Sequence, residues 1–379
     1  MNKKILPKDS CIHKWLEAMA ITEVPISYQV VTGLAIIGAV LKRNVFINQE
    51  LWRVHPNLSL LMIGPSGIGK DTVIDQAVEM LERIGSPEIV SGRTIEMVYE
   101  QMLQIGDPAC CVIPAREVSV FFGQKDYQKG MVQELTDLLS TGGSVDVSIK
   151  GTGKRKILRP TVTMLAGSTL EWLHRAMPEG SLEGGLWPRF LIVNEAYGSR
   201  YVPLIKHSLS KHERDVAVGG LRKFEIMVER IRKKYSATPR ELMILKAAQD
   251  LYTNWYINRL DYFSPMVRPY ANRSRDQVLR VAMISAISRG LPYVEEADMQ
   301  VGIDVLGEVA RTLDSAVQPA SQESRICDDV LKMLPEVPKK IMVALGRKYS
   351  LRYIKEAMAF LVETDQIKQQ SGKWYTKGD

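Results

Sequence analysis

The sequence predicts an α/β protein with a parallel sheet, followed by an all-α region and a separate small unit. Apolar runs alternate with helix-length amphipathic segments between residues 64 and 196, as expected when helices cover both faces of a parallel sheet. Helical periodicity then dominates, until a small, polar, linker-like stretch at 317–322. The predicted parts are an N-terminal helical segment (1–45), the α/β core (46–203), a helical subdomain (204–316) and the C-terminal unit (323–379).

Composition sets the class of protein. The chain has 379 residues, of which 45% are hydrophobic and 25% are charged, which supplies a large core and excludes general disorder. Its four cysteines form no CxxC pair, so we expect neither a disulfide framework nor a zinc module. No apolar export segment follows Met1, and the longest apolar stretch, 30–41, is shorter than the roughly 20 residues that span a bilayer. We therefore expect a cytoplasmic protein without membrane contact.

The individual elements follow from the same patterns. In the first half we expect helices at 11–20, 28–41, 71–84 and 129–139, and strands at 44–47, 58–63, 109–113, 161–166 and 190–193. In the all-α region we expect helices at 221–235, 240–260, 275–288 and 298–313. The second of these begins with a Thr238 cap and Pro239 at the first turn. The C-terminal unit reads as helices at 326–334, 339–345 and 351–362, followed by a hairpin over 366–376 with a Ser-Gly turn.

Residues 64–72, GPSGIGKDT, match the GxxxxGK pattern of a phosphate-binding loop. The motif lies between a predicted buried strand and a predicted helix, which is the context that it requires. Glycines let successive backbone N–H groups turn toward phosphate oxygens, the helix adds its positive end, and the lysine reaches the outer phosphates. The predicted nucleotide-binding residues are Gly64, Ser66, Gly67, Ile68, Gly69, Lys70, Asp71 and Thr72.

The residue after the lysine is Asp71, where Ser or Thr is usual, and Thr72 comes one place later. Either Thr72 enters the Mg²⁺ shell, or Asp71 approaches the metal directly or through water. Alternatively, Asp71 only stabilises the start of the helix. The sequence leaves these three interpretations open.

Two further strands end in polar residues suited to hydrolysis. Glu117 follows the strand at 109–113, where an acid would orient the attacking water, although Arg116 replaces the Asp expected before it. Ser168 and Thr169 end the strand at 161–166 and are placed to sense the terminal phosphate. The alternatives are a solvated surface glutamate and a capped helix.

A tight turn at 184–190, GGLWPRF, carries Arg189 into a strand. An arginine held there would reach the nucleotide of an adjacent subunit, a contribution of about 10³ or more in rate. Arg200 is a second, weaker candidate.

Three blocks together carry a resemblance: GPSGIGKDT at 64–72, REVSVFFGQKDYQKGMVQELTDLLS at 116–140, and GSTLEWLHRAMPEGSLEGGLWPRFLIV at 167–193. In order and spacing they resemble a family of phage and plasmid ATPases related to the helicase half of primase–helicases, over roughly residues 10–310. The resemblance implies a RecA/AAA+-like P-loop core, ATP and Mg²⁺ as ligands, and a homo-oligomeric ring, expected to be a hexamer. It makes Lys70 the phosphate lysine, Glu117 the catalytic acid, Ser168 the sensor and Arg189 the arginine finger.

Positive charge is concentrated in one predicted hairpin. The chain carries +7, and residues 144–160 place five cations against Asp146 around a Gly-Thr-Gly turn. In ring ATPases that act on DNA, a hairpin before the sensor strand projects into the pore, where these cations would neutralise phosphates. The alternative is a solvated basic turn, and a second basic run at 222–234 reads as a solvated helix face. The hairpin cations are Lys150, Lys154, Arg155, Lys156 and Arg159.

The C-terminal unit, with three helices and a hairpin, resembles a winged-helix domain. Its third helix would offer Arg352 and Lys355 to DNA, and its wing Lys368 and Lys373. Because the unit's positive balance is small, a protein contact or a structural role stays open.

These features together predict an ATP-hydrolysing, ring-forming DNA helicase or translocase of a mobile genetic element, acting on single-stranded DNA in its pore. The alternative is an ATP-dependent DNA-binding loader or regulator without unwinding activity. A small-molecule kinase, suggested by the GKDT spelling, is a third hypothesis.

Overall fold

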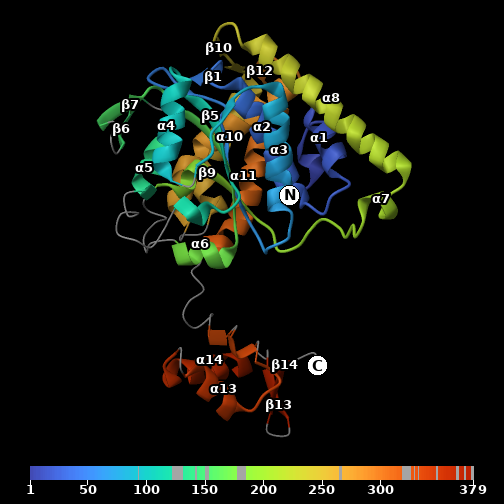
Figure 1. Ribbon diagram of the computed structural model, residues 1–379, viewed down its shortest axis with the longest axis vertical. Helices are drawn as coiled ribbons and strands as arrows, with labels where there is room; N and C mark the ends of the chain where they lie inside the picture. The colour runs from blue at the N-terminus through green and yellow to red at the C-terminus, as the bar shows by residue number, and fades with distance from the viewer. Residues whose placement is uncertain are drawn as a thin grey trace. The chain divides into compact units, whose positions relative to one another are not determined.

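The computed structural model divides the chain into two compact units, Met1–Ala316 and Val317–Asp379 (Figure 1). The structure describes residues 1–92, 94–121, 131–140, 143–149, 153–176, 185–263, 267–317, 326–327, 329–331, 333–346, 349–363, 367–370 and 373–376.

The first unit is built on a five-stranded sheet in which all neighbouring strands are parallel. This confirms the predicted α/β class with a parallel sheet. The central strands are buried along their whole length, which explains their nearly continuous apolar sequence. The strand order is β4 (Glu88–Ile89), β5 (Cys110–Ala115), β8 (Thr161–Ser168), β3 (Ser59–Ile63) and β9 (Phe190–Asn194).

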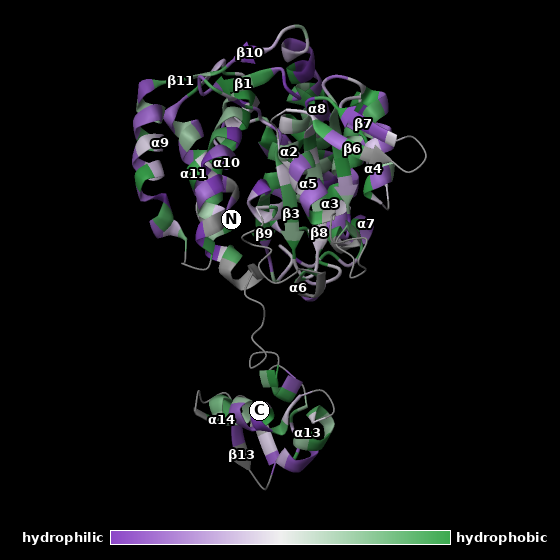
Figure 2. Cartoon of the chain, turned by 90° about the vertical axis from the view of Figure 1, so that its left-hand side faces the viewer, coloured by the Kyte–Doolittle hydropathy of each residue, from purple (hydrophilic) through white to green (hydrophobic). Residues whose placement is uncertain are grey.

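One helix explains the apolar stretch near the N-terminal end. Helix α2 (Ile26–Leu41) packs against β3, β8 and β9 and is buried along almost its whole length (Figure 2). Among the described residues, no helix is both long enough and apolar enough to cross a membrane. Helix α2 also contacts the helices α1 (Ile12–Met19), α3 (Lys70–Ile84) and α8 (Lys211–Tyr235).

The strand order decides which loops meet. After β3 the chain runs through α3 to the edge strand β4, and returns through α4 (Ile95–Ile105) to β5. Strand β8 therefore lies between β3 and β5, with Ser168 beside Ile63 and Ala166 beside Ala115. Since parallel strands end at the same edge, the segments after β3, β5 and β8 share one edge of the sheet.

The predicted helix start at 240 is wrong. Arg240 and Glu241 form strand β10, which pairs in parallel with Val45 and Phe46 of β1 (Val45–Asn48), and helix α9 begins only at Lys246 (Lys246–Asn258). Ladder hydrogen bonds from a distant strand outweigh the local helix-start pattern here. The other elements are β2 (Arg53–Val54), α7 (Ile205–Ser208), β11 (Met243–Ile244), α10 (Arg268–Ser288), β12 (Tyr293–Val294) and α11 (Glu296–Val317).

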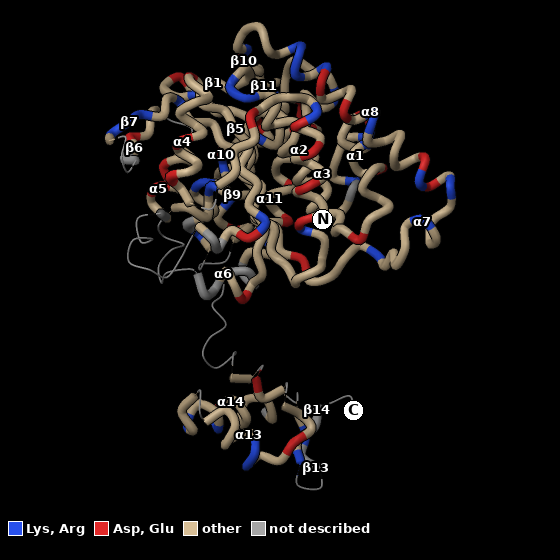
Figure 3. The backbone as a smooth tube through the Cα atoms, in the orientation of Figure 1, with Lys and Arg blue, Asp and Glu red and all other residues tan. Residues whose placement is uncertain are grey.

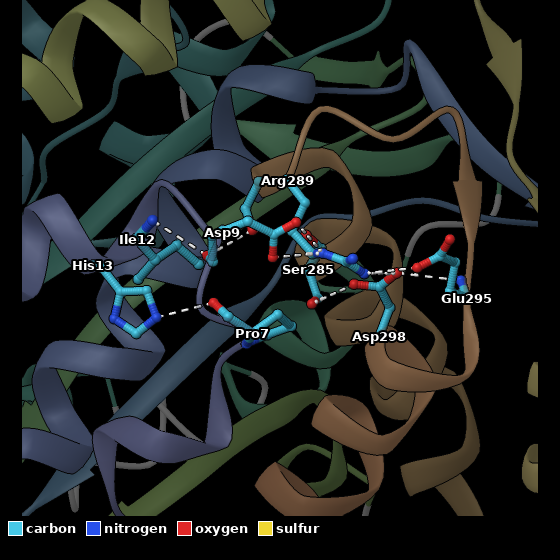
Figure 4. Close-up of polar contacts among 10 residues, drawn as sticks. Pro7, Asp9, Ile12, His13, Ser285, Arg289, Glu295 and Asp298 are labelled. Atoms are coloured by element: carbon cyan, nitrogen blue, oxygen red, sulfur yellow. Dashed lines mark hydrogen bonds and ion pairs between the residues drawn. The ribbon is translucent and has the colours of Figure 1, made fainter.

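A network of hydrogen bonds and ion pairs around Arg289 connects the N-terminal segment to this helical region (Figure 4). Arg289 donates through Nε to Asp9 (2.9 Å) and through Nη1 to Glu295 and Asp298 (both 3.1 Å). Asp298 is fully buried and also accepts from the Ser285 hydroxyl at 2.7 Å. Because a buried carboxylate is costly unless it is paired, this network fixes the N-terminal segment against α10 and α11.

The second unit has a core of its own. Helices α13 (Pro338–Leu345) and α14 (Leu351–Glu363) and a helical stretch within 326–331 enclose buried residues that include Ile326, Ile341 and Ile354. The predicted hairpin is present as the antiparallel strands β13 (Ile367–Gln370) and β14 (Lys373–Thr376). Glu336 forms an isolated antiparallel bridge to Trp374, so the hairpin continues into the region before α13.

Candidate functional site

The loop between β3 and α3 has the backbone that a phosphate cradle needs. Gly67 and Gly69 have φ angles of +81° and +95°, which residues with a side chain rarely adopt. A Cβ on Gly69 would also lie 2.8 Å from the Val24 side chain. Pro65, Ser66 and Gly67 are exposed, so the loop is open toward solvent.

The start of the loop is clamped by its neighbours. The Gly64 N–H donates to the Ser168 carbonyl at 3.2 Å. A Cβ on Gly64 would lie 2.6 Å from the Glu195 carbonyl oxygen and 2.7 Å from the Tyr28 hydroxyl. The close approach of these groups explains why this position needs glycine.

Lys70 is buried at the first residue of α3. Its Nζ donates to the carbonyl oxygens of Gly64 (2.7 Å) and Pro65 (2.8 Å). Burial lowers the pKa of this amine, while the carboxylates of Asp71 and Glu117 oppose that shift. An ammonium has three N–H donors, so one remains for a phosphate oxygen.

Glu117 and Ser168 meet at the same edge of the sheet. The fully buried Ser168 hydroxyl donates to Glu117 Oε1 at 2.7 Å. Thr169 behaves differently: its Oγ1 accepts from the Trp172 N–H at 3.2 Å and caps helix α6 (Leu170–Ala176). Of the two polar residues that end this strand, one holds the acid and the other caps the helix.

The remaining positions around the loop divide into paired and exposed groups. Arg116, which replaces an expected acid, donates through Nε to Asp75 of α3 at 2.8 Å. Asp71 and Thr72 are both exposed, and neither makes a side-chain hydrogen bond to any residue that the structure describes. Their oxygens are therefore open to a cation beside the loop. The described part of the chain contains no group of three His, Cys, Asp or Glu residues that could hold a metal alone.

The basic hairpin is formed by β6 (Val145–Ile149) and β7 (Gly153–Ile157), which are antiparallel (Figure 3). Lys154, Arg155 and Lys156 are exposed. Lys156 lies 3.6 Å from Asp146 in an ion pair. Because side chains alternate along a strand, Lys154 and Lys156 share one face and Arg155 lies on the other.

Two other predicted hairpin cations differ from this picture. Arg159 lies just after β7 and donates to Asp107 at 2.7 Å, so it contributes less free charge than the sequence indicates. Lys150 lies outside the described residues.

Arg189 lies directly before β9, where β3 and β9 begin. This is the edge of the sheet formed by the amino ends of the strands, opposite the edge at their carboxyl ends where the loop follows β3. The Nε and Nη2 of Arg189 donate to the Ser140 hydroxyl at 3.0 and 2.7 Å, and its Nη1 donates to the Gly185 carbonyl. A strand of five residues separates this end of β9 from the end beside the loop between β3 and α3, a distance of roughly 16 Å. Arg189 therefore lies too far from the loop of its own chain to contact a phosphate group bound there.

A cavity of about 240 Å³ adjoins Arg189 and contains two further arginines, Arg273 and Arg280 of α10. Sequence reasoning missed both of them. Their spacing of seven residues, which places both on one helix face, was the available signal. The other lining residues are Leu139, Ser140, Pro188, Asp276 and Gln277.

The other predicted residues lie elsewhere. Arg200 is exposed and lines a separate cavity of about 970 Å³ beside the N-terminal segment. In the second unit, Arg352 pairs with Glu356 at 2.8 Å. Lys355, Lys368 and Lys373 are exposed there.

The chain matches no protein-family model and no curated protein.

Proposed function

We propose that this protein binds and hydrolyses ATP at the loop between β3 and α3, and couples hydrolysis to movement along DNA. The observation that carries the proposal is the meeting of Lys70, Glu117 and Ser168 at one sheet edge, beside an open glycine loop. Each comes from a different segment, and each supplies a group that hydrolysis of the phosphoanhydride bond of ATP needs.

Each residue has a separate role in this proposal. The loop N–H groups and the start of α3 bind the phosphates, and Lys70 exchanges its loop carbonyls for the outer phosphate oxygens. Glu117 orients the attacking water, and Ser168 holds the Glu117 carboxylate in position through its 2.7 Å hydrogen bond. Asp71 or Thr72 would hold Mg²⁺, which neutralises charge on the phosphates when bound.

The strand order supports the finer assignment to a RecA/AAA+-like core. Strand β8 separates the strand of the phosphate loop from the strand of the acid, so the sensor residue reaches both. The helices and hairpin of the second unit, with the Glu336–Trp374 bridge, are the features that favour a winged-helix domain there.

A ring and DNA binding are supported by the placement of arginine and lysine. Arg189 lies at the opposite sheet edge from its own loop, so it would act on the nucleotide of another copy. Lys154 and Arg155 are exposed on a hairpin that precedes β8 directly, where charge would be coupled to the sensor strand. Phosphate contacts from such side chains give affinity without sequence preference.

Replacing the lysine tests the proposal. We expect Lys70→Ala to lower ATP turnover by about 10³-fold, because the variant loses the cation that contacts the transferred phosphate. Lys246→Ala is the matched control, since Lys246 is an exposed cation paired with Asp250 on α9. Equal turnover in both variants would place hydrolysis elsewhere.

Forked duplex DNA separates the alternatives. Strand displacement that requires ATP and intact Lys70 supports a helicase. DNA-stimulated hydrolysis by an assembled ring without displacement supports a loader or regulator. ATP turnover unaffected by DNA, in which the phosphoryl group is transferred to a small acceptor instead of to water, supports a kinase.

A further inference from the structure

The cavity beside Arg189 is partly open to solvent, and separate segments of the chain form its walls. Helix α10 provides four of its residues, and the segment that leads into β9 provides Pro188 and Arg189. Gln277 is buried and donates through Nε2 to the Arg189 carbonyl at 3.0 Å. The helix that carries Arg273 thus also fixes the backbone of Arg189.

Two guanidinium groups converge at this pocket. The position that a Cβ on Gly185 would occupy lies 3.2 Å from Nη1 of Arg189 and 3.3 Å from Nη2 of Arg273. The two cations are therefore close neighbours. The Arg273 guanidinium makes no hydrogen bond or ion pair to the residues that the structure describes. Arg189 uses three of the five N–H donors of a guanidinium on Ser140 and Gly185, so donors remain on both arginines.

Among the described residues, the charges that line the pocket do not balance. Burial, and then the positive charge of Arg273, lower the pKa of Arg189 to about 10, and Arg280 adds to the effect while Asp137 opposes it. Among the residues that the structure describes, Asp276 is the carboxylate that lines the pocket, and it also lies 3.5 Å from Arg275. The described lining thus contains three arginines, of which Arg280 also donates to the Asn57 carbonyl at 2.7 Å, and one carboxylate. A bound anion would relieve this repulsion.

We propose that this pocket binds a phosphate oxyanion and that Arg273 is the second cation that holds it, beside Arg189. The volume of about 240 Å³ admits a phosphate group with ordered water, given about 30 Å³ for each water. Planar guanidinium groups match the spacing of phosphate oxygens.

Two sources can supply such an oxyanion. One is the terminal phosphate of a nucleotide on a second copy of the chain, and this source rests on the proposed function. The other is free phosphate. The chain's own nucleotide is not a source, because its loop lies at the opposite edge of the sheet.

The first experiment measures whether inorganic phosphate stabilises the full-length protein against thermal unfolding. All variants carry Lys70→Ala, so that the phosphate loop contributes less to binding. We expect phosphate to raise the Tm, and Arg273→Ala to lose most of that increase. Arg268→Ala is the matched control, since Arg268 is an exposed arginine of α10 outside the pocket lining. If Arg273→Ala responds as Arg268→Ala does, the proposal is overturned.

The second experiment identifies the source. Arg273→Ala keeps its phosphate loop and Lys70→Ala keeps its arginines, so a mixed oligomer contains interfaces with both parts intact. Turnover by the mixture above the sum of the separate variants assigns the pocket to a second copy's nucleotide. Lost phosphate stabilisation without restored turnover assigns it to free phosphate. If the wild-type protein hydrolyses no ATP, the proposed function fails, and the phosphate measurement still decides the pocket.

Discussion

Charged side chains are arranged differently at the two edges of the central sheet, the one formed by the carboxyl ends of its strands and the one formed by their amino ends. At the edge beside the phosphate loop, Lys70 is held by loop carbonyls, Glu117 by Ser168, and Arg116 by Asp75. At the other edge, Arg189, Arg273 and Arg280 crowd one cavity. The charged groups at the first of these places are paired within one chain. Among the described residues, the second place has more positive than negative side chains, which is the basis of the proposed anion site.

The largest effect should come from removing Arg189. We expect Arg189→Ala to lower ATP turnover by about 10³-fold, because the charge that develops in hydrolysis loses its cation from the neighbouring copy. Steady-state hydrolysis checks this. Mixing with Lys70→Ala, which keeps Arg189, should restore part of the activity. An unrescued loss would mean that Arg189 acts within its own chain, and the two edges would not cooperate between copies.

Changing the acid should have the next largest effect. Glu117→Gln keeps the size of the side chain and an oxygen for the Ser168 hydroxyl, but cannot accept a proton, so turnover should fall by about 10²-fold. Retained ATP binding, measured by calorimetry, would show that the loop is intact. Full turnover in this variant would mean that another residue orients the water.

The buried His55 responds to the charge of Arg280, which is, after burial and Arg43, among the groups that lower its pKa. Protonation of His55 therefore makes stability depend on pH. Burial, and then the charge of Arg43, lower the pKa of His55 to about 3. In the unfolded chain the pKa is about 6.5. Between about pH 3 and pH 6.5 the histidine is therefore protonated in the unfolded chain and neutral in the folded chain. Stability should fall as pH drops below 6.5, by about 2 kcal/mol at pH 5, or roughly 30-fold in the folding equilibrium.

His55→Gln should flatten this dependence in urea unfolding at pH 7.5 and pH 5. His212→Gln, at an exposed position on α8, is the control and should keep it. Equal slopes in the two variants would contradict the role of His55.

The smallest effect is expected at the hairpin. Lys154→Ala with Arg155→Ala should weaken binding to single-stranded DNA and reduce the salt slope by about 1.4, if each side chain contacts one phosphate. Basal ATP turnover should persist. Arg222→Ala with Lys223→Ala removes the same two charges from the exposed surface of α8, and an equal loss there would indicate nonspecific attraction.

The sequence is most informative where a feature is contiguous. The loop at 64–72 and the hairpin strands could be predicted because their residues are neighbours in the chain. The spatial order of the strands could not, and it is this order that brings Ser168 to Glu117 across 51 residues. Arg116 stands where the sequence pattern predicts an Asp, and its guanidinium donates to Asp75, a partner that no local pattern specifies.

The wrong helix start at Arg240 has the same cause. Its first-turn pattern is favourable, but pairing with Val45, far earlier in the chain, decides the outcome. Arg273 was missed because apolar periodicity marks α10 as a core helix and does not show what its polar face meets.

Ser168 has a consequence for how this protein tolerates change. Its carbonyl accepts from Gly64 at the head of the loop, and its hydroxyl donates to Glu117. In the proposed mechanism, a shift of the loop on nucleotide binding would therefore also move Ser168, and with it the hydrogen bond that positions Glu117. Alanine would keep the first link and lose the second, and threonine would force a methyl group into a fully buried site. We therefore expect almost every substitution of Ser168 to reduce stability or activity.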